Sequence, residues 1–147
     1  SRNQEFMNTT IKFSQARLSP PTYALLASEA ALDTPQNYFE KVTKEYVSRR
    51  NILISELKRI KGVKGANPKG AFYCVAELPV DDADHFAQWM LEKFDHKNET
   101  LMVAPASGFY STKGEGKNQI RLAYVLNKEE LIRCVEILKM ALISYQK

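Results

Sequence analysis

Arg121 is the residue whose type and position in this sequence most clearly require a chemical explanation. It stands in the middle of the apolar run at residues 119–126, whose composition predicts a β-strand. With a period of two, Arg121 shares one face with Gln119 and Ala123, while Ile120 and Leu122 share the other face. A strand centre is an unusual place for a permanently charged guanidinium, so its surroundings decide what it does.

Three interpretations of Arg121 remain open from the residues alone. On a solvated face, the arginine would be an ordinary surface residue. On a covered face, an unpaired guanidinium would cost several kcal/mol, so it would need an anion. That anion would be an internal acid such as Glu77, or a ligand carboxylate or phosphate held at two points. Three features favour a covered pocket: the small neighbour Ala123, the glycine-containing loop 107–117, and the pair Phe72-Tyr73 on another strand.

Two other motif-like stretches do not meet the requirements of their chemistry. The glycine-rich stretch 108–118 would need glycine at position 111 and a hydroxyl residue at 118 to be a phosphate loop, but it has Ser111 and Asn118. Ser55 and Lys58 match the S-x-x-K spacing of a nucleophilic serine, without the further segments that accompany it. We interpret both stretches as structural.

The remaining polar candidates have simpler explanations. The aspartates at 81, 82 and 84 precede a predicted helix and lack the glycine and glutamate of a calcium loop, so we interpret them as helix-capping residues, with Asp81 as the cap. His85 and His96 have no partner at a catalytic or metal-binding spacing. Cys74 and Cys134 form no C-x-x-C pair and are expected to be buried, reduced thiols. No metal site is predicted.

Composition predicts an ordinary soluble domain. The chain has 147 residues, 44% of them hydrophobic and 26% charged, with a net charge of +4. Its densest basic stretch, residues 49–61, is interleaved with Glu45 and Glu56, which is typical of a solvated helix face and not of a nucleic-acid site. No apolar run approaches the roughly 20 residues that span a bilayer. We therefore expect a cytoplasmic protein with neither nucleic-acid nor membrane partners.

Hydrophobic periodicity, together with the positions of proline, glycine and capping residues, predicts the order of helices and strands. Three helices come first, at residues 5–19, 21–32 and 35–60, with prolines at their boundaries. The third is long, with one apolar stripe over its whole length. Two hairpin strands follow at residues 62–66 and 71–78, and then a helix at 81–94. Two further strands are predicted at 100–105 and 119–126. A last helix begins at residue 127, where Asn127 and Glu130 form its cap. We predict an α/β (α+β) layer sandwich, with helices on one face of a small mixed sheet of about four strands.

Several blocks of this sequence resemble, in order, the C-terminal part of class I pyridoxal-phosphate-dependent aminotransferases of the aspartate and aromatic type. The blocks are "QARLSPPTYA", "EYVSRRNILISEL", "PKGAFYCVAELP", "VAPASGFY" and "GKNQIRLAYVLN". In that family, the arginine of the last block binds the substrate α-carboxylate, which implies this role for Arg121. The G-A-F-Y block implies that Phe72 lines the substrate pocket. Ala106 departs from the pattern, because many relatives have glycine there, and this bears on the local loop geometry.

The resemblance also implies a pyridoxal 5'-phosphate cofactor, amino-acid and 2-oxo-acid substrates, and a homodimer for the whole enzyme. The family's Schiff-base lysine, in an S-x-S-K motif, does not occur in these 147 residues. We therefore expect no catalytic residue and no cofactor-binding residue in this chain, and a missing large domain of the same polypeptide as its partner. Residues 1–34 would be the linking helical segment and residues 35–147 the small domain. The alternative is a stand-alone ligand-binding or regulatory domain without catalysis.

Overall fold

The structure, a computed structural model, describes residues 1–145 and divides into two compact units. Unit 1, Ser1–Phe39, holds helices α1 (Gln4–Gln15) and α2 (Thr22–Ala31), neither of which has a buried residue. Unit 2 begins at Glu40, within helix α3 (Gln36–Leu57). The predicted domain boundary, between residues 34 and 35, lies just before α3, whereas the compact units divide within its first turns.

Helix α3 is the long helix that the apolar stripe predicts, although it ends three residues before the predicted Ile60. Past Leu57 the backbone tightens, because the amide of Ile60 donates to the carbonyl of Leu57 and that of Val63 donates to Ile60. Gly62 then ends the segment with a φ of +85°, which favours glycine. Leu53, Ile54 and Leu57 bury the C-terminal part of the helix in the core of unit 2.

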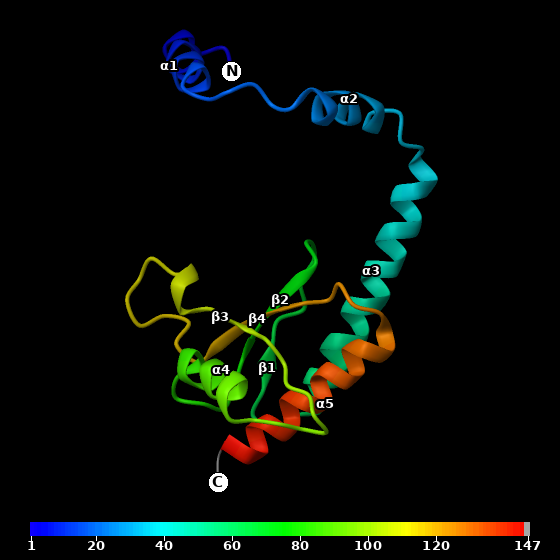
Figure 1. The fold of residues 1–147 in the computed structure, drawn as a ribbon, viewed down its shortest axis with the longest axis vertical. Helices are drawn as coiled ribbons and strands as arrows, with labels where there is room; N and C mark the ends of the chain where they lie inside the picture. The colour runs from blue at the N-terminus through cyan, green and yellow to red at the C-terminus, as the bar shows by residue number, and fades with distance from the viewer. Residues whose placement is uncertain (146–147) are drawn as a thin grey trace. The chain divides into compact units, whose positions relative to one another are not determined.

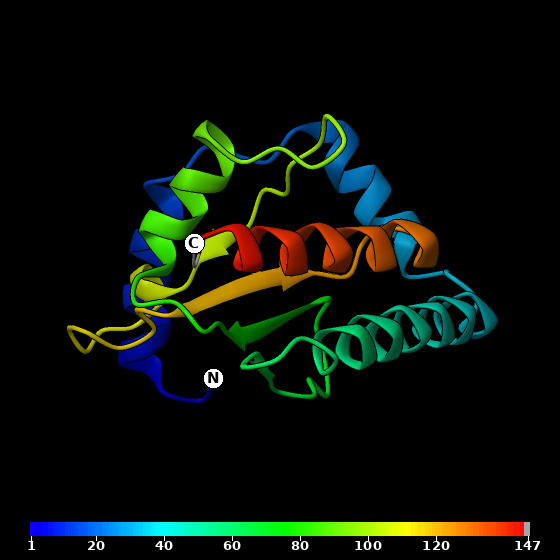
Figure 2. The same ribbon diagram turned by 90° about the horizontal axis from the view of Figure 1, so that it is seen from below.

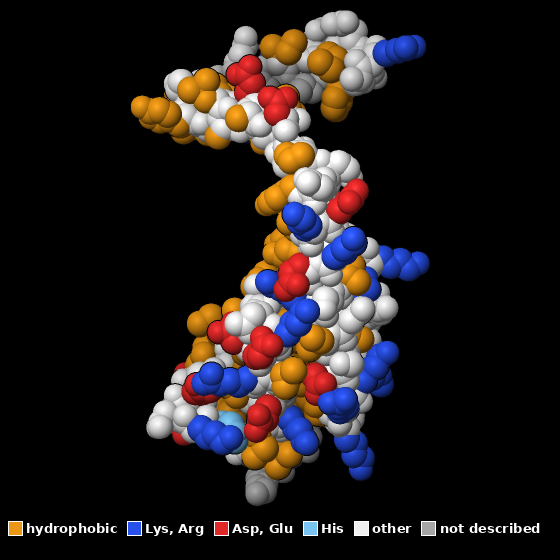
Figure 3. Space-filling view, turned by 90° about the vertical axis from the view of Figure 1, so that its right-hand side faces the viewer, with side chains coloured by type: hydrophobic (Ala, Val, Ile, Leu, Met, Phe, Trp, Pro, Cys, Tyr) orange, Lys and Arg blue, Asp and Glu red, His pale blue; other side chains and the backbone are white. Residues whose placement is uncertain are grey.

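The basic residues of α3 alternate with acidic ones on its surface, as Figure 3 shows. Arg49 Nε donates to Glu45 Oε1 over 2.8 Å, and Arg59 Nη1 lies 2.7 Å from Glu56 Oε1. The hydrogen bond from Arg49 is the main reason that the pKa of Glu45 lies below its ordinary value. These pairs agree with the interpretation of this face as solvated.

Four strands form one sheet in the order β1-β2-β4-β3. They are β1 (Lys64–Gly65), β2 (Tyr73–Glu77), β3 (Ala104–Pro105) and β4 (Gln119–Ala123). The predicted hairpin of the first two strands is confirmed. Each pairing is antiparallel, so the sheet is not mixed as predicted: β4 lies between β2 and β3 and runs against both.

Strand β3 is much shorter than the predicted strand at 100–105. Only Ala104 and Pro105 pair with β4, opposite Arg121 and Ile120. Leu101 and Met102 instead line a hollow beside the end of β4 and helix α5 (Lys128–Tyr145). Proline also has no amide hydrogen for the ladder, so this edge cannot pair further through Pro105.

One face of the sheet is covered by helices, which confirms the predicted layer sandwich. Helices α4 (Ala83–Glu92), α5 (Lys128–Tyr145) and the end of α3 enclose a single core with the inward residues of β2 and β4. Figures 1 and 2 show α5 extending along the sheet. No helix in residues 1–145 has the length and apolar character that crossing a membrane requires.

The two helices that follow the strands begin at capping side chains. Asn127 caps α5, since its Oδ1 accepts from the amide of Glu130 over 2.9 Å as predicted. The cap of α4 is Asp82 and not the predicted Asp81. Asp82 has the extended backbone of a cap residue, and its Oδ1 accepts from the amides of Asp84 and His85. The prediction was wrong by one residue because neighbouring aspartates offer the same side chain.

Candidate functional site

Arg121 lies on the face of the sheet opposite to the helices. Ile120 beside it is completely buried, whereas Arg121 and Ala123 are exposed. From β2, Tyr73 and Val75 lie on the same face as Arg121, with Val75 directly opposite it in the register. The predicted covering of this face is therefore not provided by the described residues of unit 2, where the sheet has helices on one side only.

Two aromatic rings contact the guanidinium of Arg121. Its Cζ atom lies 5.2 Å from the centroid of the Tyr73 ring and 4.8 Å from that of Phe109, both within cation–π range. Within residues 1–145 no carboxylate pairs with Arg121, and Glu77 instead binds Lys64 Nζ over 3.0 Å. The internal ion pair with Glu77, one of the three interpretations, is therefore wrong. The two rings contact Arg121 through their π faces, which do not occupy its N–H donors. The guanidinium N–H groups therefore remain available for a ligand.

Phe109 reaches Arg121 from a short 3-10 turn, η1 (Ser107–Phe109), which directly follows β3 and Ala106. Ser107 Oγ donates to Asp84 Oδ2 over 2.6 Å, which ties the turn to the first turn of α4. Ala106 is completely buried and has a φ of −99°. Because this φ is negative, the position does not require glycine.

The far side of this loop is closed by a second set of contacts. Tyr110 Oη donates to Gln119 Oε1 over 2.6 Å, and the Tyr110 ring packs so closely on Gly116 that a side chain there would collide with it. Gly116 also has a φ of +69°, which a side chain disfavours. These contacts hold both ends of the loop against β4, the strand that carries Arg121.

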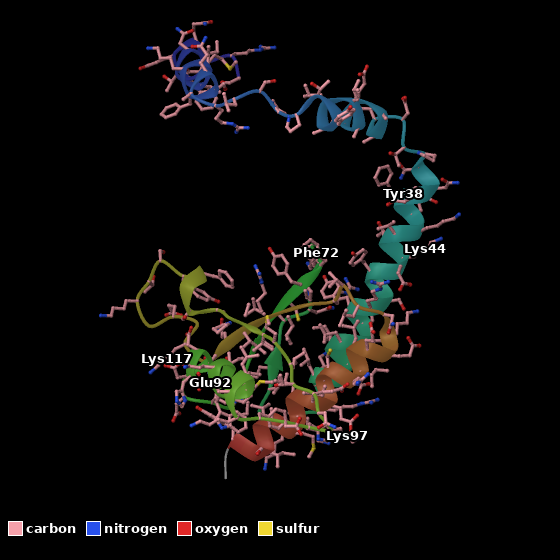
Figure 4. The ribbon with its side chains drawn as sticks, in the orientation of Figure 1. Tyr38, Lys44, Phe72, Glu92, Lys97 and Lys117 are labelled. Carbon is pink, nitrogen blue, oxygen red and sulfur yellow. The ribbon has the colours of Figure 1, made fainter. Side chains whose placement is uncertain are left out.

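Phe72 lines a different hollow from Arg121. It lies just before β2, where Figure 4 labels it. It is half exposed, at 51%, and borders a pocket of about 420 Å³. The other walls come from α3, the turn before Phe72, and the end of β4; among them are Tyr46, Arg50 and Tyr124. Arg121 lines a smaller hollow of about 240 Å³ at the edge of the sheet. Tyr73 lies between the two predicted site residues, because its ring contacts Arg121 and meets that of Phe72 edge-on.

The turn that presents Phe72 has an unusual backbone. Ala71 adopts a φ of +60°, a left-handed conformation that costs a residue with a side chain roughly 1 kcal/mol. The hydroxyl of buried Tyr124 donates to the carbonyl of Ala71 over 3.1 Å, and the amide of Tyr124 donates to the carbonyl of Phe72 over 2.8 Å. Tyr124 therefore stabilises the conformation that directs Phe72 towards the pocket.

The other titratable candidates have structural surroundings. Burial raises the pKa of the Cys74 thiol to about 11 and also raises that of Cys134. Both are free thiols; Cys74 is buried as predicted, but Cys134 is only half-buried. His85 Nδ1 lies 2.6 Å from Tyr145 Oη, beside an aromatic cluster. The described residues contain no group of three or more metal-binding side chains.

Sequence reasoning grouped Tyr73 with Phe72 as part of the pocket expected beside Arg121, but it did not identify Phe109. The signal for Tyr73 was present, because its register places it on the same face as Arg121, one strand away. No pattern could have indicated Phe109, because its position depends on how the loop at 106–118 folds back over the sheet.

The comparison with known families agrees with this geometry. The family model for aminotransferase class I and II matches residues 1–138. The chain belongs to this family. The predicted resemblance is therefore confirmed, and the family depends on pyridoxal phosphate.

Individual aminotransferases match over most of this chain. It is 31% identical over 125 residues to an aspartate aminotransferase of Pyrococcus horikoshii, covering 82% of this chain and 30% of that protein. It is 31% identical over 114 residues to an LL-diaminopimelate aminotransferase of Desulforudis audaxviator, covering 77% of this chain and 27% of the relative. The crystal structure of the α-aminoadipate aminotransferase LysN of Thermus thermophilus matches with a TM-score of 0.80 and 26% identity, over 97% of this chain and 36% of LysN. This chain thus spans about a third of the length of these aminotransferases.

Proposed function

We propose that this chain is the substrate-binding small domain of a pyridoxal-phosphate-dependent aminotransferase. The reaction would transfer an amino group between an amino acid, aspartate or a related one, and a 2-oxo acid. The large domain of the same polypeptide and a second subunit would be its partners. Family membership and the similarity to an aspartate aminotransferase support this assignment.

Arg121 would bind the substrate α-carboxylate. The observation that carries this proposal is a guanidinium on an open sheet face, held by rings and not by an acid. A planar guanidinium can grip a carboxylate through two parallel N–H···O bonds, which fixes both its position and its orientation. Holding the substrate in the reactive geometry lowers the activation free energy, because the entropy of bringing two reactants together has already been lost on binding. Phe72 would line the substrate pocket of the complete enzyme, although in this chain it borders a separate hollow from Arg121.

The hollow beside Arg121 does not fit as the holder of the cofactor itself. Besides Arg121, the hollow at its side is lined by apolar residues and Cys134, and it has no lysine amine and no second cation for a phosphate. In the family, the bound cofactor supplies the electron sink for the reaction. The contribution proposed for this chain is therefore to bind and orient the substrate.

The substitution Arg121→Lys in the complete gene product tests the proposed role. We expect a higher KM for the amino acid and a fall in kcat/KM of at least about tenfold, roughly 1.4 kcal/mol, because lysine offers a point charge in place of a two-point grip. Steady-state kinetics with aspartate, alanine, phenylalanine and 2-aminoadipate as amino donors measure the effect and identify the preferred substrate. The matched control is Arg59→Lys, since the exposed Arg59, just past the end of α3, pairs with Glu56.

Unchanged kinetics in Arg121→Lys would remove Arg121 from the substrate site. The domain assignment has a separate test, because the gene should also encode a segment with the S-x-S-K lysine. Residues 1–147 expressed alone should neither turn over substrate nor acquire a lysine-bound cofactor absorbance. Turnover by this chain alone would contradict the proposal that it binds the substrate and lacks the catalytic lysine.

A further inference from the structure

We propose that Tyr73 and Phe109 are positioning residues for Arg121, and that the Ser107–Asp84 hydrogen bond holds Phe109 in place. We call Tyr73 and Phe109 together the aromatic brace. The inference rests on the proposed carboxylate-binding role of Arg121. It assigns a task to residues that bind neither the cofactor nor the reacting atoms.

The kind of partner that Arg121 has is the main argument. An arginine side chain has several rotatable bonds, so an unsupported guanidinium on an open sheet face would sample many positions and lose entropy on binding a substrate. An acidic neighbour would order it but would also occupy the N–H donors that a carboxylate needs. Aromatic rings order the guanidinium by contact with its carbon centre, at 5.2 Å for Tyr73 and 4.8 Å for Phe109, and leave the donors free.

The two members of the aromatic brace are held differently. Tyr73 belongs to β2, where it pairs with Ala123 in the regular ladder, so the sheet fixes its position. Phe109 is on a loop, 57% exposed, and needs another support. The hydrogen bond from Ser107 Oγ to Asp84 Oδ2 supplies it, because Asp84 belongs to the first turn of a helix whose N-terminus Asp82 caps. The Tyr110–Gln119 bond fixes the chain just beyond Phe109.

The first experiment compares Phe109→Leu with Phe109→Tyr in the complete enzyme. Leucine keeps an apolar side chain but removes the ring, whereas tyrosine keeps the ring and can place its hydroxyl in solvent. We expect Phe109→Leu to lower kcat/KM for the amino acid about threefold or more, mainly through KM, and Phe109→Tyr to stay within about twofold of the wild type. Tyr73→Leu and Tyr73→Phe form a second pair with the same expectation.

A double-mutant cycle separates positioning from general stability. If Phe109 acts through Arg121, then Phe109→Leu should have little further effect, within about twofold, in the Arg121→Lys background. An equal loss in both backgrounds would show that Phe109 acts independently and would overturn the proposal. A role in stability alone would lower the thermal midpoint without the KM effect, and would overturn it as well.

The same cycle distinguishes this proposal from the one on which it rests. If Arg121→Lys changes nothing, the carboxylate-binding role fails, and the aromatic brace fails with it. If Arg121→Lys has its expected effect but Phe109→Leu and Tyr73→Leu do not, only the aromatic brace is wrong.

The Ser107–Asp84 bond has its own test in Ser107→Ala. We expect a rise in KM of about twofold, in the same direction as for Phe109→Leu, and no additional effect when both substitutions are combined. The matched control is Ser55→Ala, because Ser55 donates to a carbonyl within the exposed part of α3. A change in KM as large in Ser55→Ala, or full additivity with Phe109→Leu, would contradict the supporting role of Ser107.

Discussion

The two faces of strands β2 and β4 differ completely although they share one backbone. On the covered face, Ala76 and Ile120 are completely buried beneath the helices. On the open face, Tyr73 and Arg121 are exposed and contact each other. The same ladder of hydrogen bonds therefore serves two purposes. Burial of apolar side chains on the covered face stabilises the fold. The ordered strands then hold the charged Arg121 on the open face.

Ile120 and Arg121, adjacent in sequence, give the sharpest test of this comparison. Ile120→Ala should lower the free energy of unfolding by about 2–4 kcal/mol, because it leaves a cavity between the sheet and the helices. Arg121→Ala should lower it by only about 1 kcal/mol, because the side chain is exposed and loses just its two cation–π contacts. Urea denaturation of both variants, followed by circular dichroism, measures the difference. Equal losses would mean that the two faces contribute alike to stability.

The buried thiol on the covered face should make folding stability depend on pH. The pKa of Cys74 is raised from 9.0 to about 11 by burial, so in the unfolded chain the thiol ionises at lower pH than in the folded one. Stability is then fully present below about pH 9 and falls as the pH rises towards 11. The loss over this window should be larger, by about 2 kcal/mol, than in Cys74→Ala. Identical pH profiles of the two proteins would contradict the burial of this thiol.

A smaller effect is expected for Tyr124→Phe, at the end of β4. The substitution keeps the buried ring but removes the hydroxyl that donates to the carbonyl of Ala71. The free energy of unfolding should fall by about 1 kcal/mol, the usual net value of one hydrogen bond. The double variant with Ala71→Gly, which relieves the left-handed backbone, should recover part of this loss. If it does not, Tyr124 does not stabilise the turn that presents Phe72.

Patterns with a single physical cause were predicted well. The apolar stripe of α3, the hairpin around residues 67–70, the Asn127 cap and the order of elements each follow from local periodicity or turn chemistry, and the structure has all of them. Predictions of the exact position of a cap and of the extent of a strand were less accurate. Asp82 caps α4 in place of Asp81, and the strand at 100–105 keeps only its last two residues in the ladder.

The sequence by itself indicated which residues of β4 share a face, because strand residues alternate between the two faces of a sheet. It also identified Arg121 as an unusual strand residue. The resemblance to aminotransferases then implied a function for it. Only the tertiary structure decided what Arg121 touches. The rings of Tyr73 and Phe109 come from a neighbouring strand and from a loop that Asp84 holds from α4. Contacts between segments so distant in sequence depend on how the loop folds over the sheet, which no local pattern records.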